Sequence, residues 1–111
     1  MEENKKDFPE KLIRKFVLGF INLHILYHAR KEPIYGKEFK KELKRHGYDI
    51  SFGTLYPIFH NLEKEGILKA EKRKVHGKIR KYYSITEKGE KIFIYSKERA
   101  KELLNELFKE N

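Results

Sequence analysis

The fold is decided by residues 35–66, which read YGKEFKKELKRHGYDISFGTLYPIFHNLEKEG. Phe39 and Leu43 stand four positions apart, so they share one face of a helix that we predict over residues 35–46. A second helix is predicted over residues 52–65, where apolar residues again recur at helical spacing. Two short helices joined by a tight turn predict a helix-turn-helix unit.

The ends of both helices carry signals of their own. Gly47 is the expected stop of helix 35–46, because glycine accepts the left-handed conformation in which many helices end. Ser51 supplies a side-chain oxygen to cap helix 52–65, and Gly66 ends that helix. Pro57 lacks an N–H that an α-helix would use, so we expect either a distorted first turn or regular helix from about Thr54.

The predicted helix 52–65 has two chemically different faces. At about 100° per residue, its apolar sector contains Phe52, Leu55, Ile58, Phe59 and Leu62, its opposite sector contains Gly53, Pro57, His60, Asn61 and Lys64, and its borders are Thr54 and Tyr56. A helix that buries one face and presents small, polar and basic groups on the other can enter the major groove of DNA. The alternative is an ordinary solvated helix face.

A basic β-hairpin is predicted over residues 67–85. Two runs with strand-like patterns flank His76-Gly77-Lys78, where Gly77 allows a tight reversal. Its basic side chains are Lys69, Lys72, Arg73, Lys74, His76, Lys78, Arg80 and Lys81. This cluster suits the neutralisation of phosphates, whereas the alternative is an edge hairpin kept soluble by lysines. Tyr82 and Tyr83 alternate in a strand, so one faces the core and the other faces outward.

The first helix is predicted over residues 8–30. Asp7, or else Lys6, caps its start with Pro9 in the first turn, and Pro33 ends it. Its apolar residues are Leu12, Ile13, Phe16, Val17, Leu18, Phe20, Ile21, Leu23, Ile25 and Leu26. They occupy more than one stripe, whereas a surface helix of a monomer needs only one. A second burial partner is therefore expected for this helix.

A last helix is predicted from residue 87 to about residue 109, with Thr86 as its cap. Its apolar residues are Ile92, Tyr95, Ala100, Leu103, Leu104, Leu107 and Phe108, with broadly helical spacing. The expected fold is mainly α-helical with one small β-hairpin. We divide it into a DNA-binding unit over residues 1–86 and a C-terminal helix over residues 87–111.

The composition favours a polyanionic partner. Lysine and arginine number 26 against 17 acidic residues, which gives a formal charge of +9 and a pI near 9.6. Cysteine is absent, which excludes disulfides and zinc–thiolate clusters. A charged start and an interrupted apolar run over residues 16–27 predict neither export nor a membrane span, so we expect a cytoplasmic protein. Heavy use of lysine, glutamate and isoleucine without glutamine predicts thermal unfolding above the mesophile range.

Three motifs stand out along the chain: SFGTLYP at 51–57, LEKEGIL at 62–68 and GKIRKYYSITEKG at 77–89. In order and spacing they resemble the signature of the PadR family of transcriptional regulators. Tyr35-Gly36 before Glu38-Phe39 also resembles that family's entry to the second helix, so the resemblance covers about residues 10–95. Lys78-Ile79 departs from the Arg-Pro that is frequent at the family's wing tip.

The resemblance implies a dimeric winged helix-turn-helix repressor, in which helix 52–65 reads the major groove and the hairpin is a wing on the flanking backbone. The DNA-binding residues that we predict are Lys37, Ser51, Gly53, Thr54, Tyr56, Pro57, His60, Lys64, Lys78, Arg80 and Lys81. By matching positions, the serine, threonine and tyrosine of this set make phosphate or base contacts, and Arg80 and Lys81 serve the wing. Gly53 suits this role, because a missing side chain lets the helix start approach a phosphate closely.

The resemblance also implies that the C-terminal helix pairs with the first helix of a partner subunit, which agrees with the excess of apolar residues in that helix. The predicted homodimer interface consists of Phe16, Phe20, Leu23, Ile92, Tyr95, Leu103, Leu104, Leu107 and Phe108. Such a dimer would place its recognition helices about 34 Å apart and bind a pseudo-palindromic operator. In some relatives the interface encloses a small-molecule effector. Candidate lining residues are Phe16, Phe20, Phe93, Tyr95 and Phe108, unless these are plain core.

Other functions have weaker support in the sequence. His24 and His28 have metal-ligand spacing, but a third ligand is not evident, so we interpret them as packing or interface residues and predict no cofactor. A catalytic triad, an acid pair and a phosphate loop are all missing from the pattern, so we do not expect an enzyme. The main alternative is a winged-helix module that binds RNA or another protein, although most aromatic residues lie in apolar stripes rather than where RNA bases would stack.

Overall fold

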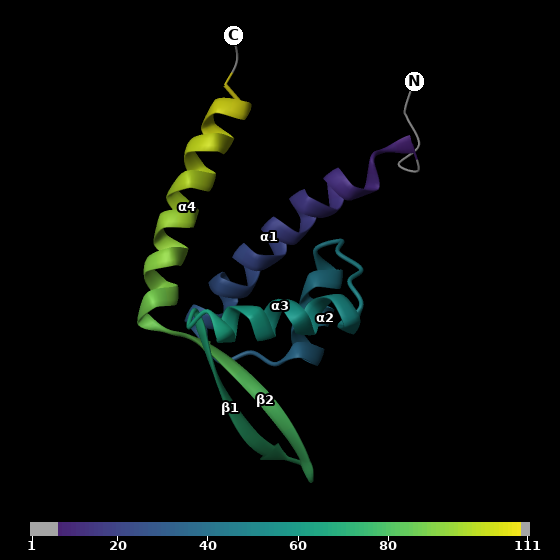
Figure 1. Ribbon diagram of the computed structural model, residues 1–111, viewed down its shortest axis with the longest axis vertical. Helices are drawn as coiled ribbons and strands as arrows, with labels where there is room; N and C mark the ends of the chain where they lie inside the picture. Colours follow the sequence, from purple (N-terminus) through teal and green to yellow (C-terminus); the bar gives the residue numbers. More distant parts are fainter. Residues whose placement is uncertain (1–6, 110–111) are drawn as a thin grey trace.

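The computed structural model describes residues 7–109, which form four helices and one β-hairpin. Figure 1 shows how these elements are arranged. In chain order the elements are α1 (Glu10–Lys31), α2 (Gly36–Arg45), α3 (Phe52–Lys64), β1 (Leu68–Val75), β2 (Lys78–Ile85) and α4 (Glu87–Leu107). All were predicted from the sequence, and their ends differ from the predicted ones by at most two residues. The mainly helical fold is confirmed: α2 and α3 form a helix-turn-helix, and β1 with β2 forms the wing.

One hydrophobic core is shared by residues from every element. Its buried members are Ile21, Ile25, Leu26, Ala29, Ile34, Phe39, Leu43, Leu55, Phe59, Leu62, Leu68, Tyr83 and Phe93. The fully buried residues of α1 all lie in its second half, where Ile21 and Ile25 are buried, whereas Phe16 and Phe20 remain exposed. From the first half, Val17 and Leu18 pack against the core but are only partly buried. The first two turns of α1, residues 10–16, therefore project beyond the core of their own chain.

Tyr83 holds the wing against the core. Its backbone exchanges two hydrogen bonds with Ile34, with N···O distances of 2.9 and 2.7 Å, so the segment between α1 and α2 lies along β2. The Tyr83 ring is buried and stacks on Phe59 of α3 with 4.6 Å between ring centroids. This answers the question that strand alternation leaves open: Tyr83 faces the core and Tyr82 faces away.

Two of the three predicted side-chain caps are confirmed. Ser51 Oγ accepts a hydrogen bond from the Thr54 N–H at 3.2 Å, and Thr86 Oγ1 accepts one from the Gly89 N–H at 2.9 Å. The Thr86 hydroxyl also donates to the Gly66 carbonyl at 2.6 Å. Thr86 thus starts α4 and fastens this start to the end of α3.

The start of α1 differs from the prediction. Pro9 is itself the N-cap residue rather than a member of the first turn, and its carbonyl accepts from the N–H groups of Leu12 and Ile13 at 3.1 Å. Asp7 does not cap the helix, and Lys6 lies outside the described residues. Pro9 has an extended backbone, with φ −67° and ψ 104°, so it precedes the first turn instead of belonging to it. Proline also disfavours helical backbone at the residue before it, which keeps the helix from starting earlier.

The wing reverses at a two-residue turn rather than within three residues. His76 and Gly77 both have positive φ, at 50° and 77°, the pattern of the type I′ turn whose twist matches the flanking strands. Lys78 is consequently the first residue of β2 and pairs with Val75. The reversal leaves Ile79 near the tip, where it is 73% exposed.

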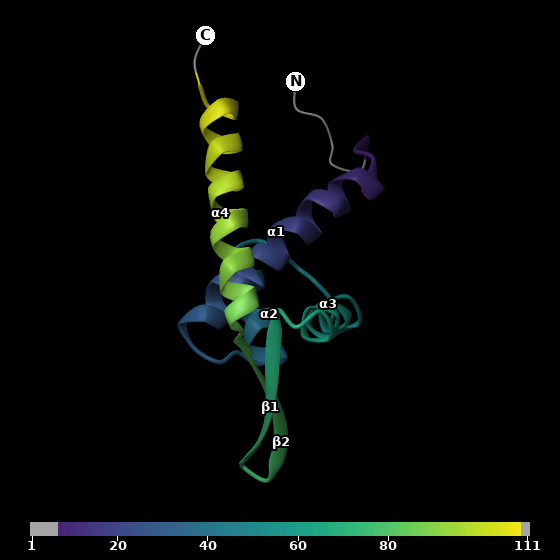
Figure 2. The same cartoon turned by 60° about the vertical axis from the view of Figure 1, so that its left-hand side comes forward.

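The two long helices, α1 and α4, diverge from the core as a pair of arms (Figure 1). Near the point where they meet, Arg30 Nη2 donates to Glu90 Oε1 at 2.6 Å. Figure 2 shows the wing extending from the opposite end of the molecule. Within residues 7–109, no helix has the length and apolar character needed to cross a membrane.

Candidate nucleic-acid interface

The outer face of α3 is open to solvent, as the helical wheel predicts. Leu55, Phe59 and Leu62 are buried against the core. The residues of the opposite sector are all exposed: Gly53, Pro57, His60, Asn61 and Lys64. A helix with one buried face and one small, polar and basic face therefore stands on the surface, as major-groove reading requires.

Helix α3 is continuous through its proline. The Ser51 carbonyl accepts from the N–H groups of both Thr54 and Leu55, at 3.1 and 3.0 Å, and helix runs from Phe52 past Pro57. Of the two alternatives considered for Pro57, a later helix start near Thr54 is therefore wrong, and the predicted start at Phe52 is confirmed. The proline removes one donor, but the turn before it is already closed by the serine cap.

Phe52 also differs from its predicted place in the apolar sector. Its side chain is 37% exposed, and its ring stacks on Tyr56 with 5.2 Å between centroids and 15° between planes. Because the two residues are one helical turn apart, aromatic stacking replaces burial in the core. An exposed aromatic pair therefore borders the start of α3.

The start of α3 gathers polar groups from two helices. Ser51 Oγ donates to Thr54 Oγ1 at 3.3 Å, and Arg14 of α1 donates to the same Thr54 oxygen through Nη2 at 3.4 Å. Arg14 was missed by the sequence analysis because it lies 40 residues from Thr54 in the chain. Its guanidinium adds a positive charge beside a helix N-terminus, which itself favours anions.

Gly53 exposes the backbone of this same turn. A Cβ atom at residue 53 would have Ser51 Oγ as its nearest neighbour, at 3.7 Å, which is an ordinary contact. The fold of the free chain therefore does not require glycine at this position. Close approach of an external group to the helix start does benefit from it.

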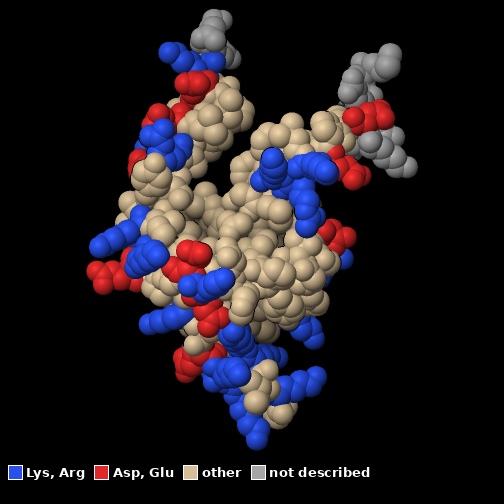
Figure 3. Space-filling view, viewed as in Figure 1, with Lys and Arg blue, Asp and Glu red and all other residues tan. Residues whose placement is uncertain are grey.

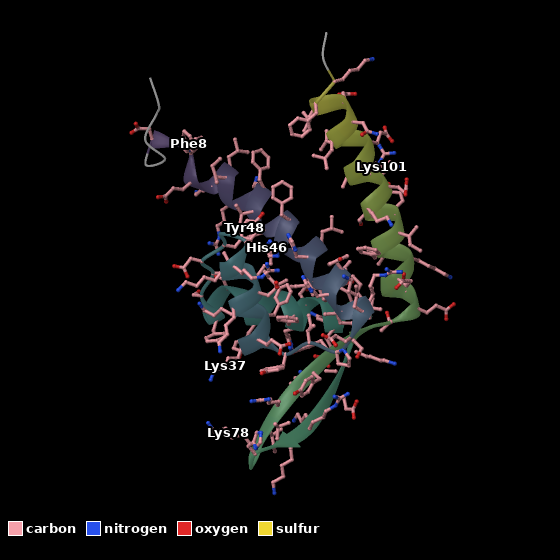
Figure 4. All side chains as sticks on the ribbon, turned by 180° about the vertical axis from the view of Figure 1, so that it is seen from behind. Phe8, Lys37, His46, Tyr48, Lys78 and Lys101 are labelled. Atoms are coloured by element: carbon pink, nitrogen blue, oxygen red, sulfur yellow. The ribbon has the colours of Figure 1, made fainter. Side chains whose placement is uncertain are left out.

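A hollow of about 410 Å³ lies between the start of α2, α3 and the wing. It is lined by Tyr35, Gly36, Lys37, Tyr56, Lys78, Ile79, Arg80, Lys81 and Tyr83. Figure 4 shows Lys37 and Lys78 along the same edge of the molecule, where the start of α2 faces the wing. Five predicted DNA-binding residues from three separate elements thus meet around one hollow.

Arg80 is held in place by aromatic rings. Its guanidinium carbon lies 4.5 Å from the centroid of the Tyr35 ring, and hydrogen bonding to the Tyr82 hydroxyl raises the pKa of Arg80. Arg73 lies over the other tyrosine, 4.6 Å from the centroid of Tyr82. Stacking on an aromatic ring positions a guanidinium without neutralising its positive charge.

Lys81 has a different environment from its neighbour. Its Nζ forms an ion pair with Glu63 Oε1 of α3 at 2.9 Å, and this neighbouring carboxylate raises the pKa of Lys81. Successive strand residues face opposite sides, so Arg80 and Lys81 point away from each other. Among residues 7–109, Lys81 forms an ion pair with an acid, whereas Arg80 forms none.

The charged side chains are unevenly distributed over the surface. Figure 3 shows lysine and arginine side chains gathered over the wing, whereas uncharged surface lies between the two arms. The basic wing is thus separated along the long axis of the molecule from the uncharged surface between the arms.

Most residues of the predicted homodimer interface lie exposed on the two arms. Phe16, Phe20, Tyr95, Leu103, Leu104, Leu107 and Phe108 each expose half or more of their surface. Leu23 and Ile92 are instead half-buried and pack against the core of their own chain. Ile94, which was not predicted, is 51% exposed and adds to the apolar surface of α4.

A cleft of about 640 Å³ separates α1 from α4. Among the five aromatic residues considered for an effector pocket, only Phe20 and Phe93 line it. Phe16, Tyr95 and Phe108 do not, because they lie elsewhere on the arms and are exposed. The rest of the lining includes Lys97 and Lys101, so cationic groups border an otherwise largely apolar space.

A histidine cluster lies beside this cleft. The rings of His24 and His46 are 5.3 Å apart, and those of His24 and His28 are 6.3 Å apart. Burial lowers the pKa of His24, and the nearby His46 and His28 lower it further. Burial also lowers the pKa of His28, against the opposing influence of Glu42. Among residues 7–109, no three metal-binding side chains are grouped so that they could hold an ion.

Comparison with known proteins identifies the family. Residues 25–93 match the family described as "Transcriptional regulator PadR-like family", which is more than half of the chain. The chain belongs to the PadR-like family. PadR-like regulators bind DNA, so this protein is a DNA-binding transcriptional regulator rather than an enzyme.

Similar proteins agree with this assignment to the PadR-like family. "Transcriptional regulator Rv3488" of Mycobacterium tuberculosis is 39% identical over 95 residues, which are 86% of this chain and 89% of the relative. A PadR family regulator of Eggerthella lenta has a similar structure, with a TM-score of 0.71, 29% identity and coverage of 92% of this chain and 96% of that one. A PadR-like transcription factor of Bacteroides fragilis has a TM-score of 0.75 at 28% identity, with coverage of 87% and 95%.

Proposed function

We propose that this PadR-like regulator binds a pseudo-palindromic DNA operator as a homodimer in the cytoplasm and represses transcription there. The observation that carries the proposal is the basic hollow in which the start of α2, the exposed side of α3 and the wing meet. In this proposal α3 enters the major groove, Ser51, Thr54 and Arg14 approach a phosphate, and Arg80 meets the flanking backbone.

The same proposal assigns residues 1–86 to DNA binding and the helix in residues 87–111 to dimerisation. Its support is the exposed apolar surface of both arms, which a monomer would leave in water. A partner's arms would cover Phe16 and Phe20 of α1 and the leucines of α4. The cleft between the arms would then lie at the interface, where a small apolar effector could bind.

Titration with matched nucleic acids tests this function. A labelled DNA duplex, an RNA duplex and a single-stranded RNA of one sequence are compared by fluorescence anisotropy at physiological salt. We expect the DNA duplex to bind most tightly, and Lys37→Ala to weaken it more than the control Lys91→Ala, which removes the same charge from α4 outside the hollow. Tighter binding of single-stranded RNA, stacked on Phe52 and Tyr56, would contradict the proposal and favour an RNA-binding module.

A further inference from the structure

Gly36, the first residue of α2, leaves space for a side chain of α3. A Cβ atom at residue 36 would lie 2.5 Å from Cε1 of Tyr56 and 3.2 Å from its hydroxyl oxygen. The first distance is below 3.0 Å, which real Cβ atoms essentially never show, so the Tyr56 ring would have to shift. Gly36 is not among the glycines with positive φ, so its role is spatial rather than conformational.

Tyr56 rests on this bare backbone while remaining accessible. It is 48% exposed, and its ring also stacks on Phe52 at 5.2 Å. It lines the basic hollow together with Lys78 and Arg80 of the wing. The two contacts fix the ring, and its position brings the phenol into a region where cations gather.

We infer that Gly36 is a positioning residue, which seats the Tyr56 phenol where it donates a hydrogen bond to a DNA phosphate. The inference rests on the proposed function, and it adds Gly36 as a residue that affects DNA binding through Tyr56. Tyr56 lies on the border of the outer face of α3, and the flank of a helix in the major groove faces the sugar-phosphate wall rather than the base edges. A neutral donor at this place adds affinity without releasing a counterion.

A double-mutant cycle tests the inference. The unaltered protein, Gly36→Ala, Tyr56→Ala and the double variant are titrated with one DNA duplex at several salt concentrations. We expect each single variant to bind about ten-fold more weakly, the effect of losing a hydrogen bond to a charged group, with the salt slope unchanged. Gly36→Ala should have no further effect in the Tyr56→Ala background, because the ring that it displaces is then absent.

A third substitution separates the position of the ring from its donor. Tyr56→Phe keeps the ring and removes the hydroxyl, so it should weaken binding about as much as Tyr56→Ala. Gly36→Ala should add nothing to Tyr56→Phe. Equal losses from Gly36→Ala in every background would mean that a side chain at residue 36 obstructs DNA directly, and would overturn the inference. No loss from Gly36→Ala in the unaltered protein would overturn it as well.

Thermal unfolding of the same four proteins controls for the fold. The clashing atoms are the far end of the Tyr56 side chain, so Gly36→Ala should fold with Tyr56 displaced. If Gly36→Ala lowers the unfolding midpoint of the unaltered protein, it should not lower the midpoint of the Tyr56→Ala variant, which lacks the displaced ring. A drop in the midpoint in both backgrounds would contradict the inference. Failure of the unaltered protein to bind DNA would overturn the proposed function too, whereas independent effects of the two substitutions would overturn only the role of Gly36.

Discussion

Lys81 Nζ lies 2.9 Å from Glu63 Oε1 of α3, so a carboxylate of this helix already balances the charge of this wing lysine. The adjacent Arg80 faces the other side of the strand and stacks on Tyr35. Neighbouring cations that look equivalent in the sequence therefore have different electrostatic roles. Only the arginine is expected to displace a counterion from DNA at no cost to an existing ion pair.

Arg80→Ala should lower affinity for every DNA duplex and reduce the slope of log affinity against log salt by about one. Lys81→Ala should change this slope less, because Glu63 competes with phosphate for the ammonium. Anisotropy titrations between about 50 and 200 mM salt measure both slopes. Glu63→Gln serves as the matched control and should strengthen binding by freeing Lys81. Identical slopes for the arginine and lysine variants would contradict this division of roles.

Gly53→Ala should separate stability from DNA binding. The new methyl group meets nothing closer than 3.7 Å, and alanine favours a helix over glycine by about 1 kcal/mol, so the unfolding midpoint should stay or rise. Affinity for DNA should nevertheless fall, because the methyl group would stand between the start of α3 and a phosphate. Calorimetry and a mobility shift on the same preparation measure the two quantities. Unchanged affinity would show that DNA does not approach this turn closely.

Leu103→Lys combined with Leu107→Lys should produce monomers. Both leucines are exposed on α4, at 56% and 64%, so the change costs little folding energy within one chain. Burying two ammonium groups in an apolar interface would, however, oppose association strongly. Sizing by light scattering should show half the mass, and affinity for an operator should fall. A dimer that persists would place the interface elsewhere; Lys109→Ala, close to the end of the same helix region, is a control that should leave the mass unchanged.

Folding stability should decrease as the pH falls below the ordinary histidine pKa of 6.5. Burial lowers the pKa of His24 and His28 in the folded state, so below 6.5 the unfolded chain binds more protons than the folded one. The loss begins near 6.5 and ends once the pH is below the lowered folded pKa values. Urea unfolding at several pH values between 8 and 5, about the range in which histidine titrates, measures it. His24→Gln should make folding stability depend less on pH. A urea midpoint that rises on acidification would contradict the prediction.

The elements and their caps could be predicted because they depend on neighbouring residues. Ser51 and Thr86 act within three residues along the chain, and the faces of α3 follow from helical spacing. The helical wheel failed at Phe52 because it assigns a side to a residue without showing whether the core extends that far. The contacts that build the site depend on distant pairs, and Arg14 with Thr54 is the clearest case.

The two tyrosines of β2 also show what the sequence alone does not predict. Strand alternation requires that Tyr82 and Tyr83 face opposite ways, but it does not say which one packs inward. The answer depends on the backbone pairing of Tyr83 with Ile34, about fifty positions earlier in the numbering, and on the ring of Phe59. Gly36 is similar, because its motif was visible in the sequence and its contact with Tyr56 was not.

Selection from a random pool of double-stranded DNA tests the central claim most directly. The full chain is incubated with the pool at physiological salt and competitor DNA, and bound fragments are sequenced and then measured by mobility shift. The account predicts an inverted repeat whose half-sites lie about 10 base pairs apart, bound by two copies of the chain. Recovery of no common sequence, with binding that merely weakens as salt rises, would contradict operator recognition by a homodimer.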